Sequence, residues 1–209
     1  MKNGNEWVSI GDFMAGIVGV LVLFFVVAAL ISFSSQWDKQ MVKQKGAAQV
    51  IGRLQKIVLN NKDLKGIDFK PQTNTMILND SSFSQGSACL NPNLQKVFGD
   101  KLSDIIITEM KNNRKLAVQI EGHTDNVEVH GVSANIYQLC APFDDNYTLS
   151  AGRAREARKA LFPKNKLENT NVLERVSVVG YGPDRLINKS NPNAPENRRV
   201  EIKFISEEN

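Results

Sequence analysis

The chain has few cysteines, few histidines, few aromatic residues and no long block of one charge. Of its 209 residues, 2 are cysteine and 2 are histidine, and aromatic residues make up 7%. The 26 Lys and Arg are interspersed with 22 Asp and Glu, for a net charge of +4. Nucleic-acid-binding proteins usually carry a basic stripe, or aromatic side chains between basic ones. We therefore expect no nucleic-acid partner.

Charge is absent from one long segment near the N-terminus. No charged residue occurs between Phe13 and Phe33, and a helix of that length, at about 1.5 Å per residue, reaches about 30 Å, the thickness of a bilayer core. A cleaved signal peptide has a shorter apolar stretch, about 7–15 residues, that ends at a small-residue cleavage site. The sequence therefore predicts a retained anchor, with a lead at 1–11, a transmembrane helix at 12–34 and a juxtamembrane helix or linker at 35–64.

The two histidines do not form a recognisable metal motif. His123 and His130 flank Asp125 in the pattern H-x-D-x4-H. Structural and catalytic zinc sites need three or four protein ligands at typical spacings, and no further ligand stands at such a spacing. Nor does any Ser, His and Asp pattern mark an activated nucleophile. We expect no metal, no cofactor and no enzymatic activity.

The remainder of the chain alternates between strand and helix patterns. Apolar residues recur at helical spacing from Val50 to Val58 and again over 91–111, and shorter alternating runs indicate strands. The order β-β-α-β-α-β-β predicts a two-layer α/β domain over 65–209, with a mixed sheet and the helices on one side. Strands are expected at 65–70, 73–78, 115–121, 175–180 and 199–205, and a last helix at about 150–162.

The two cysteines lie in different loops of this domain. Cys89 precedes the first helix of the domain, and Cys140 lies in a long loop between a strand and the last helix. An even count in an oxidising compartment suits a disulfide, but two buried free thiols fit the sequence equally well.

The charges around the apolar segment favour a cytoplasmic C-terminal domain, since lysines follow the segment and positive charge usually marks the cytoplasmic side.

Four motifs together resemble the OmpA-like peptidoglycan-binding domain. They are "IEGHTDN" (120–126), "NYTLSAGRAREARKAL" (146–161), "VVGYG" (178–182) and "ENRRVEI" (196–202), in this order over residues 70–205. "FSQGSACLNP" (83–92) is similar to the loop that enters the first helix of that domain, with a cysteine where the family has none. The loop at 127–145 is longer than in the simplest members.

The resemblance implies a ligand and the residues that bind it. Diaminopimelate in a peptidoglycan stem offers an ammonium and a carboxylate, which need an anionic acceptor and a planar cation. Asp125 is expected to bind the ammonium and Arg153 the carboxylate, while Asn146 and Thr124 hold the loop and the ligand. Arg198 either is structural or adds charge. Taken without the motif, Asp125 would be a turn-capping carboxylate and Arg153 a solvated helix residue.

A fifth motif, "WVSIGDFMA" (7–15), resembles the start of the transmembrane helix in MotB-like stator subunits of ion-driven motors. The resemblance implies that Asp12 carries a proton or a sodium ion, that two copies stand inside a ring of MotA-like subunits, and that the domain is periplasmic. It places the protein in the inner membrane, crossing it once with the N-terminus cytoplasmic. Asp12 alone could instead cap the helix at the interface, but Gly11, Ala15 and Gly19 form a small-residue ridge beside it, typical of close helix packing.

Two other functions fit the same sequence. A passive tether would link membrane and cell wall without conduction, and a scaffold module would bind something other than wall peptide. Within the motor class, the short lead and the compact spacing are closer to non-flagellar stators such as the Zorya antiphage defence B subunit.

Overall fold

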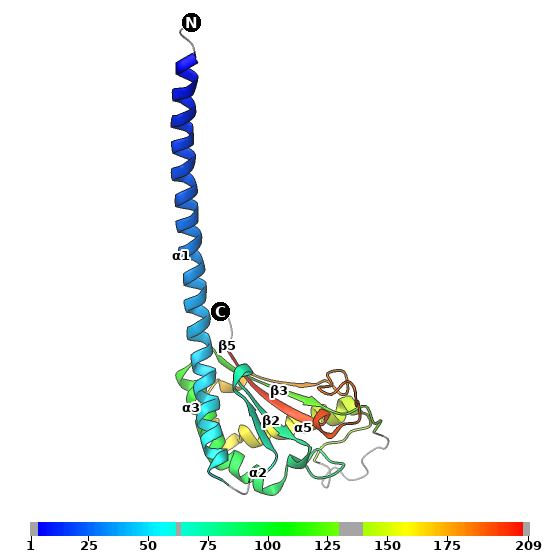
Figure 1. Ribbon diagram of the computed structural model, residues 1–209. Helices are drawn as coiled ribbons and strands as arrows, with labels where there is room; N and C mark the ends of the chain where they lie inside the picture. Colours follow the sequence, from blue (N-terminus) through cyan, green and yellow to red (C-terminus); the bar gives the residue numbers. More distant parts are fainter. Residues whose placement is uncertain (1–3, 62–63, 130–139, 207–209) are drawn as a thin grey trace. The chain divides into compact units, whose positions relative to one another are not determined.

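The structure is a computed structural model that describes residues 4–61, 64–129 and 140–206, with side chains described outside 4–9 and 36–45. His130 and the middle of the long loop therefore lie outside the described residues. The chain divides into two compact units, residues 1–43 and residues 44–209. Figure 1 shows the elements of each unit.

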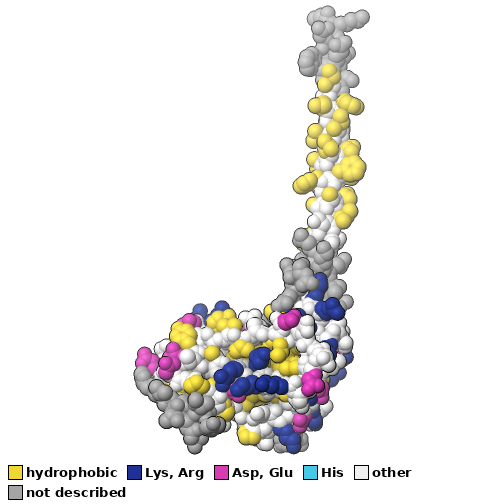
Figure 2. Space-filling view, turned by 180° about the vertical axis from the view of Figure 1, so that it is seen from behind, with side chains coloured by type: hydrophobic (Ala, Val, Ile, Leu, Met, Phe, Trp, Pro, Cys, Tyr) yellow, Lys and Arg dark blue, Asp and Glu magenta, His cyan; other side chains and the backbone are white. Residues whose placement is uncertain are grey.

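Helix α1 runs without interruption from Gly4 to Leu59. Within it, Ile10–Ser35 has a mean hydropathy of 3.0 and is long and apolar enough to cross a membrane. Its large apolar side chains are exposed, as for Phe25 at 76%, and the part visible in Figure 2 carries only hydrophobic side chains. An exposed apolar surface of this extent needs lipid or a partner to cover it.

The end of α1 belongs to the second unit. Helix α1 continues through Gly46, where a Cβ would lie 2.7 Å from Asn113 Nδ2. Ala47, Val50, Ile51 and Leu54 are buried in the core of the domain. The expected amphipathic helix is therefore the last part of α1.

Five strands form one mixed sheet in the order β1-β2-β5-β3-β4. They are β1 (Ile67–Lys70), β2 (Thr75–Asn79), β3 (Leu116–His123), β4 (Val176–Gly180) and β5 (Arg199–Ser206). The pairs β1/β2, β2/β5 and β3/β5 are antiparallel, and β3/β4 is parallel. The expected order of strands and helices is confirmed.

The helices after β2 differ from the expected single helix at 91–111. The segment consists of α2 (Pro92–Val97), a π-helical turn (Phe98–Leu102) and α3 (Ser103–Asn112). Phe98 and Leu102, the first and last residues of this π-helical turn, are both buried in the core. The periodic apolar residues of this segment do not reveal such a turn.

Helix α5 (Asn146–Leu161) begins four residues before the expected position. Asp145 caps it: its carboxylate accepts from Thr148 N at 2.7 Å, and Thr148 Oγ1 accepts from Asp145 N at 3.1 Å. This reciprocal pair, a capping box, satisfies two backbone donors that the first turn of a helix leaves free. The cap fixes where α5 starts, and Asn146 becomes its first residue.

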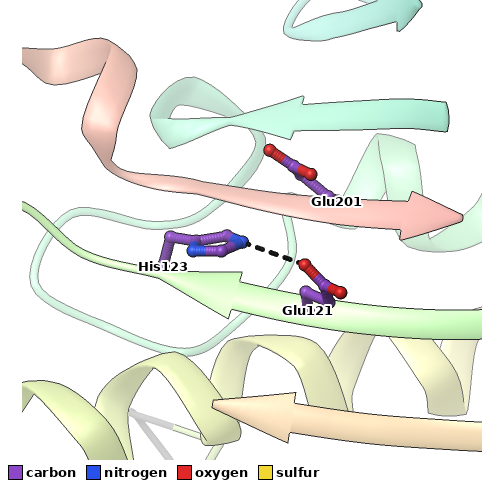
Figure 3. A group of neighbouring side chains, drawn as sticks. All are labelled: Glu121, His123 and Glu201. Atoms are coloured by element: carbon purple, nitrogen blue, oxygen red, sulfur yellow. Dashed lines mark ion pairs between the residues drawn. The ribbon is translucent and has the colours of Figure 1, made fainter. Parts of the chain in front are cut away.

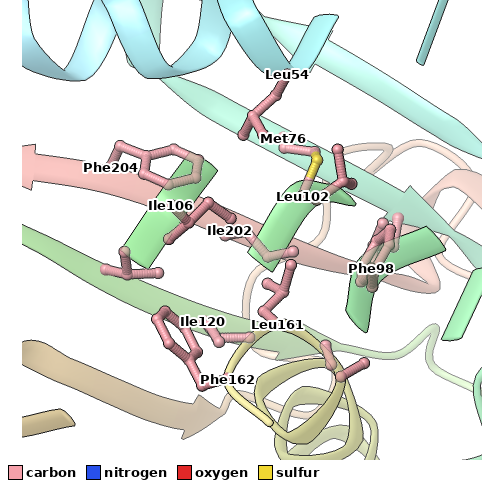
Figure 4. Close-up of a cluster of buried hydrophobic side chains, with 14 of the residues drawn as sticks. Leu54, Met76, Phe98, Leu102, Ile106, Ile120, Leu161, Phe162, Ile202 and Phe204 are labelled. Atoms are coloured by element: carbon pink, nitrogen blue, oxygen red, sulfur yellow. The ribbon is translucent and has the colours of Figure 1, made fainter. Parts of the chain in front are cut away.

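All helices of the domain contribute to one hydrophobic core against one face of the sheet (Figure 4). The core joins Leu54 of α1, Ile106 of α3 and Leu161 of α5 to alternate residues of β3 and β5, such as Ile120 and Ile202. The intervening residues of the same strands, which include Glu121 and Glu201, point to the other face because side chains alternate along a strand. The predicted two-layer fold is confirmed.

Close contact between α5 and the sheet requires glycine in β3. A Cβ on Gly122 would lie 1.9 Å from Ser150 O. The helix backbone therefore rests directly on the end of β3, and this contact sets the distance between the "GHTD" segment and the side chains of α5.

Candidate ligand-binding site

The five residues expected to form the site all line one pocket of about 580 Å³. It lies at one end of the sheet. Thr124 and Asp125 follow β3, and Arg198 precedes β5. Because β3 and β5 are antiparallel with His123 opposite Arg199, these three residues meet at the same edge. Asn146 and Arg153 come from α5 and lie seven residues apart, two turns on one face.

Four charged side chains form a continuous ion-pair network in this pocket. Arg198 Nη1 lies 2.6 Å from Asp125 Oδ2, and Arg198 Nε lies 3.0 Å from Asp80 Oδ2. Arg153 Nη1 donates to the other oxygen of Asp80 at 3.2 Å. The two guanidiniums thus share the carboxylate of Asp80. Within this network, the two positive charges of the arginines balance the two negative charges of the aspartates.

Asp80 is the site residue that the motif comparison missed. It lies in a short 3-10 turn, Asp80–Ser82, directly after β2. Asn79 pairs with Arg199 in the β2/β5 register, so Asp80 lies next to Arg198. Only this register brings the two together, and it is a tertiary feature rather than a sequence pattern.

Arg153 is held rigidly. Its Nε donates to Ser87 O at 3.1 Å, and its guanidinium lies 5.1 Å from the centre of the Phe83 ring. The side chain is 5% exposed. Burial lowers the pKa of Arg153, and the carboxylate of Asp80 partly offsets this effect. A buried guanidinium of fixed orientation is suited to bind a carboxylate.

Arg198 is more exposed and better paired than Arg153. Burial alone would lower its pKa, but hydrogen bonds to Asp125 and Asp80 outweigh that effect and raise it. The residue that the sequence left as structural or charge-bearing therefore connects both acidic side chains of the ion-pair network.

Two buried polar atoms in the pocket have no hydrogen-bond partner among the described residues. They are Thr124 Oγ1 and Asn146 Oδ1. The amide nitrogen of Asn146, in contrast, donates to Val127 O at 2.9 Å, which holds the start of the long loop. Because leaving a buried polar atom unpaired is unfavourable, both oxygens are available to a ligand that enters the pocket.

A disulfide ties the two loops at the rim of the pocket. Cys89 and Cys140 are bonded, with 5.1 Å between their Cα atoms, so of the two open alternatives the bridge is the correct one. Beneath it Ala88, Ala141 and Leu149 belong to a small separate hydrophobic cluster. The bridge therefore anchors the segment that supplies Ser87 and Phe83 to Arg153.

A second cluster of ionisable groups lies on the other face of the sheet (Figure 3). Glu121, His123 and Glu201 present ligand atoms within 4.8 Å of one another. Lys203 Nζ lies 2.7 Å from Glu121 and 3.3 Å from Glu201, so an ammonium already occupies the cation position between the carboxylates. Arg199 adds a further positive charge 2.6 Å from Glu201, and this surrounding does not favour a metal.

His123 in this cluster is neutral. Its Nε2 lies 3.6 Å from Glu121, but burial above all, with the nearby charge of Arg199, lowers its pKa to about 3. The contact is therefore not an ion pair at neutral pH. His123 stacks on Tyr181, 5.5 Å between ring centres, and is a packing residue rather than a ligand.

Asp12 lies in the first unit, on the apolar part of α1. It borders a groove of about 540 Å³ along the helix surface, whose other residues include Phe13, Gly16 and Ile17. Apart from the chain neighbours and the nearby backbone of α1 itself, no described atom lies within 4 Å of the Cβ position of Gly11, Gly16 or Gly19. The small-residue ridge is therefore open to another helix.

Comparison with known proteins identifies the second unit. The model of the OmpA family matches residues 82–199. A putative MotB-like protein from Desulfovibrio vulgaris superposes with a TM-score of 0.53 at 22% identity, covering 80% of this chain and 99% of that chain. The periplasmic domain of Helicobacter pylori MotB gives 0.44 at 22% identity, covering 65% and 77%. The cell wall anchor of the T6SS from Pseudomonas aeruginosa gives 0.46 at 17%, covering 73% and 96%. No curated protein matches the sequence.

Proposed function

Because the chain belongs to the OmpA family, whose model matches more than half of it, we propose that the pocket around Arg153 binds the diaminopimelate of a peptidoglycan stem. The family is one of non-enzymatic, peptidoglycan-binding proteins. The observation that carries the proposal is the balanced network of two carboxylates and two guanidiniums.

A zwitterionic ligand matches this network charge for charge. Its carboxylate replaces an acidic side chain beside Arg153, and its ammonium is bound by Asp125. Asp125 is already oriented, since it also accepts a hydrogen bond from Val127 N at 3.2 Å. The free oxygens of Thr124 and Asn146 add hydrogen-bond acceptors for the ammonium or for a peptide N–H.

Co-sedimentation of the full chain with purified sacculi tests this function. Arg153→Gln removes the buried charge and should weaken binding by about tenfold or more, as expected for loss of a buried charge pair. Arg155→Gln is the matched control, because Arg155 is exposed on the same helix. Equal sedimentation of both variants, with unchanged melting temperatures, would exclude the pocket as the wall-binding site.

We also propose that the protein is the B subunit of an ion-driven motor, with Asp12 as the carrier of a proton or a sodium ion. The support is the coexistence in one chain of an apolar segment long enough to span a membrane, an acidic residue within it, an open small-residue ridge and a wall-binding domain. A carboxylate inside a membrane is costly, and such residues usually serve ion or proton pathways. The partners would be a ring of MotA-like subunits and a second copy of the chain.

Substitution of Asp12 separates a motor from a passive tether. In the motor, Asp12→Asn abolishes ion-dependent function while the protein still co-purifies with a polytopic partner, and Asp12→Glu keeps part of the activity. In the tether, Asp12→Asn has no effect and no polytopic partner co-purifies. A neighbouring gene for a multi-span subunit would support the motor class.

The proposed location is the inner membrane, with the N-terminus cytoplasmic and the domain periplasmic. The Cys89–Cys140 bridge supports it, because disulfides persist in the periplasm and are rare in the cytosol. The lysines that follow the apolar segment, including Lys39 and Lys43, oppose it. Labelling of a cysteine introduced at the exposed residue Asp100, with a membrane-impermeant reagent in intact spheroplasts, decides the orientation.

A further inference from the structure

Asp80 differs from Asp125, the other acidic residue of the ion-pair network, in how it is held. Asp125 is 8% exposed and also accepts a backbone hydrogen bond. Asp80 is 37% exposed, and its side chain contacts only the two guanidiniums among the described residues. Asp125 is therefore part of the framework, whereas the carboxylate of Asp80 is exchangeable.

The backbone of Asp80 is fixed by contacts that do not involve its carboxylate. The buried Ser82 in the same turn donates to Gly66 O at 2.7 Å, and Phe83 N donates to Asp80 O at 3.1 Å. Rotation about the side-chain bonds is enough to move the carboxylate from the arginines into solvent. No rearrangement of the turn is required.

The position of the Asp80 carboxylate is that of a bound carboxylate. One oxygen lies 3.2 Å from Arg153 and the other 3.0 Å from Arg198, so it bridges two guanidiniums. A ligand carboxylate that accepts a hydrogen bond from Arg153 Nη1 must occupy the position of the Asp80 carboxylate. Without any carboxylate there, two like charges would face each other across the pocket.

We propose that Asp80 is a specificity-determining residue that occupies the carboxylate position of the empty pocket and is displaced by the ligand. The proposal rests on the function proposed above. A plain carboxylate that displaces Asp80 adds a negative charge near Asp125, while Asp80 itself remains at the mouth of the pocket. A zwitterion also brings an ammonium, which Asp125 binds and which offsets the added charge, so the pocket selects ligands that carry both charges.

Two small probes test this selection on the full chain in detergent. They are meso-diaminopimelate and pimelate, which share a seven-carbon dicarboxylate chain but differ in the amino groups. Calorimetric titration of the wild type should favour diaminopimelate. Asp80→Asn should bind pimelate about tenfold or more tightly than the wild type, since a competing charge is removed, and the preference for diaminopimelate should fall. Asp100→Asn, the same charge change at an exposed position outside the pocket, should change neither.

Asp80→Ser, which also removes the carboxylate, must reproduce the gain, and thermal melting checks that both variants fold. Any result in which neither variant gains affinity for pimelate overturns the inference, whatever the wild type does with sacculi. If the variants gain affinity for pimelate and the wild type prefers diaminopimelate to pimelate but does not bind sacculi, the inference holds and the proposed wall-binding function fails.

Discussion

Removal of the Cys89–Cys140 bridge should destabilise the domain substantially. The two cysteines are 51 residues apart. In the chain-entropy model a closed loop of that length restricts the unfolded chain by about 14 cal/mol/K, which corresponds to about 4 kcal/mol at 25 °C. Measured values are often lower than this model gives. We therefore expect the double variant Cys89→Ser, Cys140→Ser to lose about 2–4 kcal/mol of unfolding free energy.

Removal of the bridge should also weaken ligand binding in the pocket. The bridge anchors the segment whose Ser87 carbonyl accepts from Arg153 and whose Phe83 ring lies against its guanidinium. A looser segment lets Arg153 sample other orientations, so ligand binding should weaken by a few-fold in addition to the loss of stability.

Urea denaturation of the oxidised wild type, the reduced wild type and the double variant measures the loss of stability, and calorimetric titration with meso-diaminopimelate measures the loss of binding. The reduced wild type and the variant should unfold at similar, lower urea concentrations. A stability difference below about 1 kcal/mol between oxidised wild type and variant would refute the reasoning, because the bridge would then not restrict the unfolded chain as its loop length requires.

Three further predictions concern positions that the fold or its pH dependence needs. The pKa of His123 falls from 6.5 to about 3 on folding, so between these values the unfolded chain binds a proton that the folded chain excludes. Stability should therefore drop by up to about 1.4 kcal/mol per pH unit as the pH falls through this range. His123→Gln should flatten that slope in denaturation series at pH 7, 5.5 and 4, and parallel slopes would contradict this. Gly122→Ala places a Cβ 1.9 Å from Ser150 O and should cost about 3 kcal/mol or more by chemical denaturation, whereas a loss below 1 kcal/mol would show that α5 can shift freely. Asp145→Ala removes the cap that pairs with Thr148 and should lower the melting temperature. Asp100→Ala, which removes an exposed carboxylate outside α5, is the control, and an equal or larger effect there would contradict the assignment of the cap.

Much of the domain could be predicted from local patterns. Alternating and helical spacings of apolar residues identify strands and helices because each strand or helix buries one face. These spacings predicted the order of the elements and the packing of the helices on one side of the sheet. The exact ends of the helices could not be predicted from these patterns. The start of α5 depends on the exchange between Asp145 and Thr148, and the turn at Phe98–Leu102 depends on core packing.

The site was predicted as far as its motifs reach. Asp125 and Arg153 could be named from the sequence because each lies in a motif. Their ion-pair partners in the structure are Arg198 and Asp80, respectively. Asp80 lies in no motif, and its place depends on the register of β2 against β5. Lys203 likewise meets Glu121 only through strand pairing. Long-range pairing is the information that a single sequence does not display.

The most direct test of the wall-binding claim is release of the protein from sacculi by free ligand. Sacculi-bound wild-type protein should be released by meso-diaminopimelate, and pimelate, which lacks the amino groups, should release much less at the same concentration. Retention of the protein at a saturating concentration of diaminopimelate would contradict the assignment of the pocket between Asp125 and Arg153.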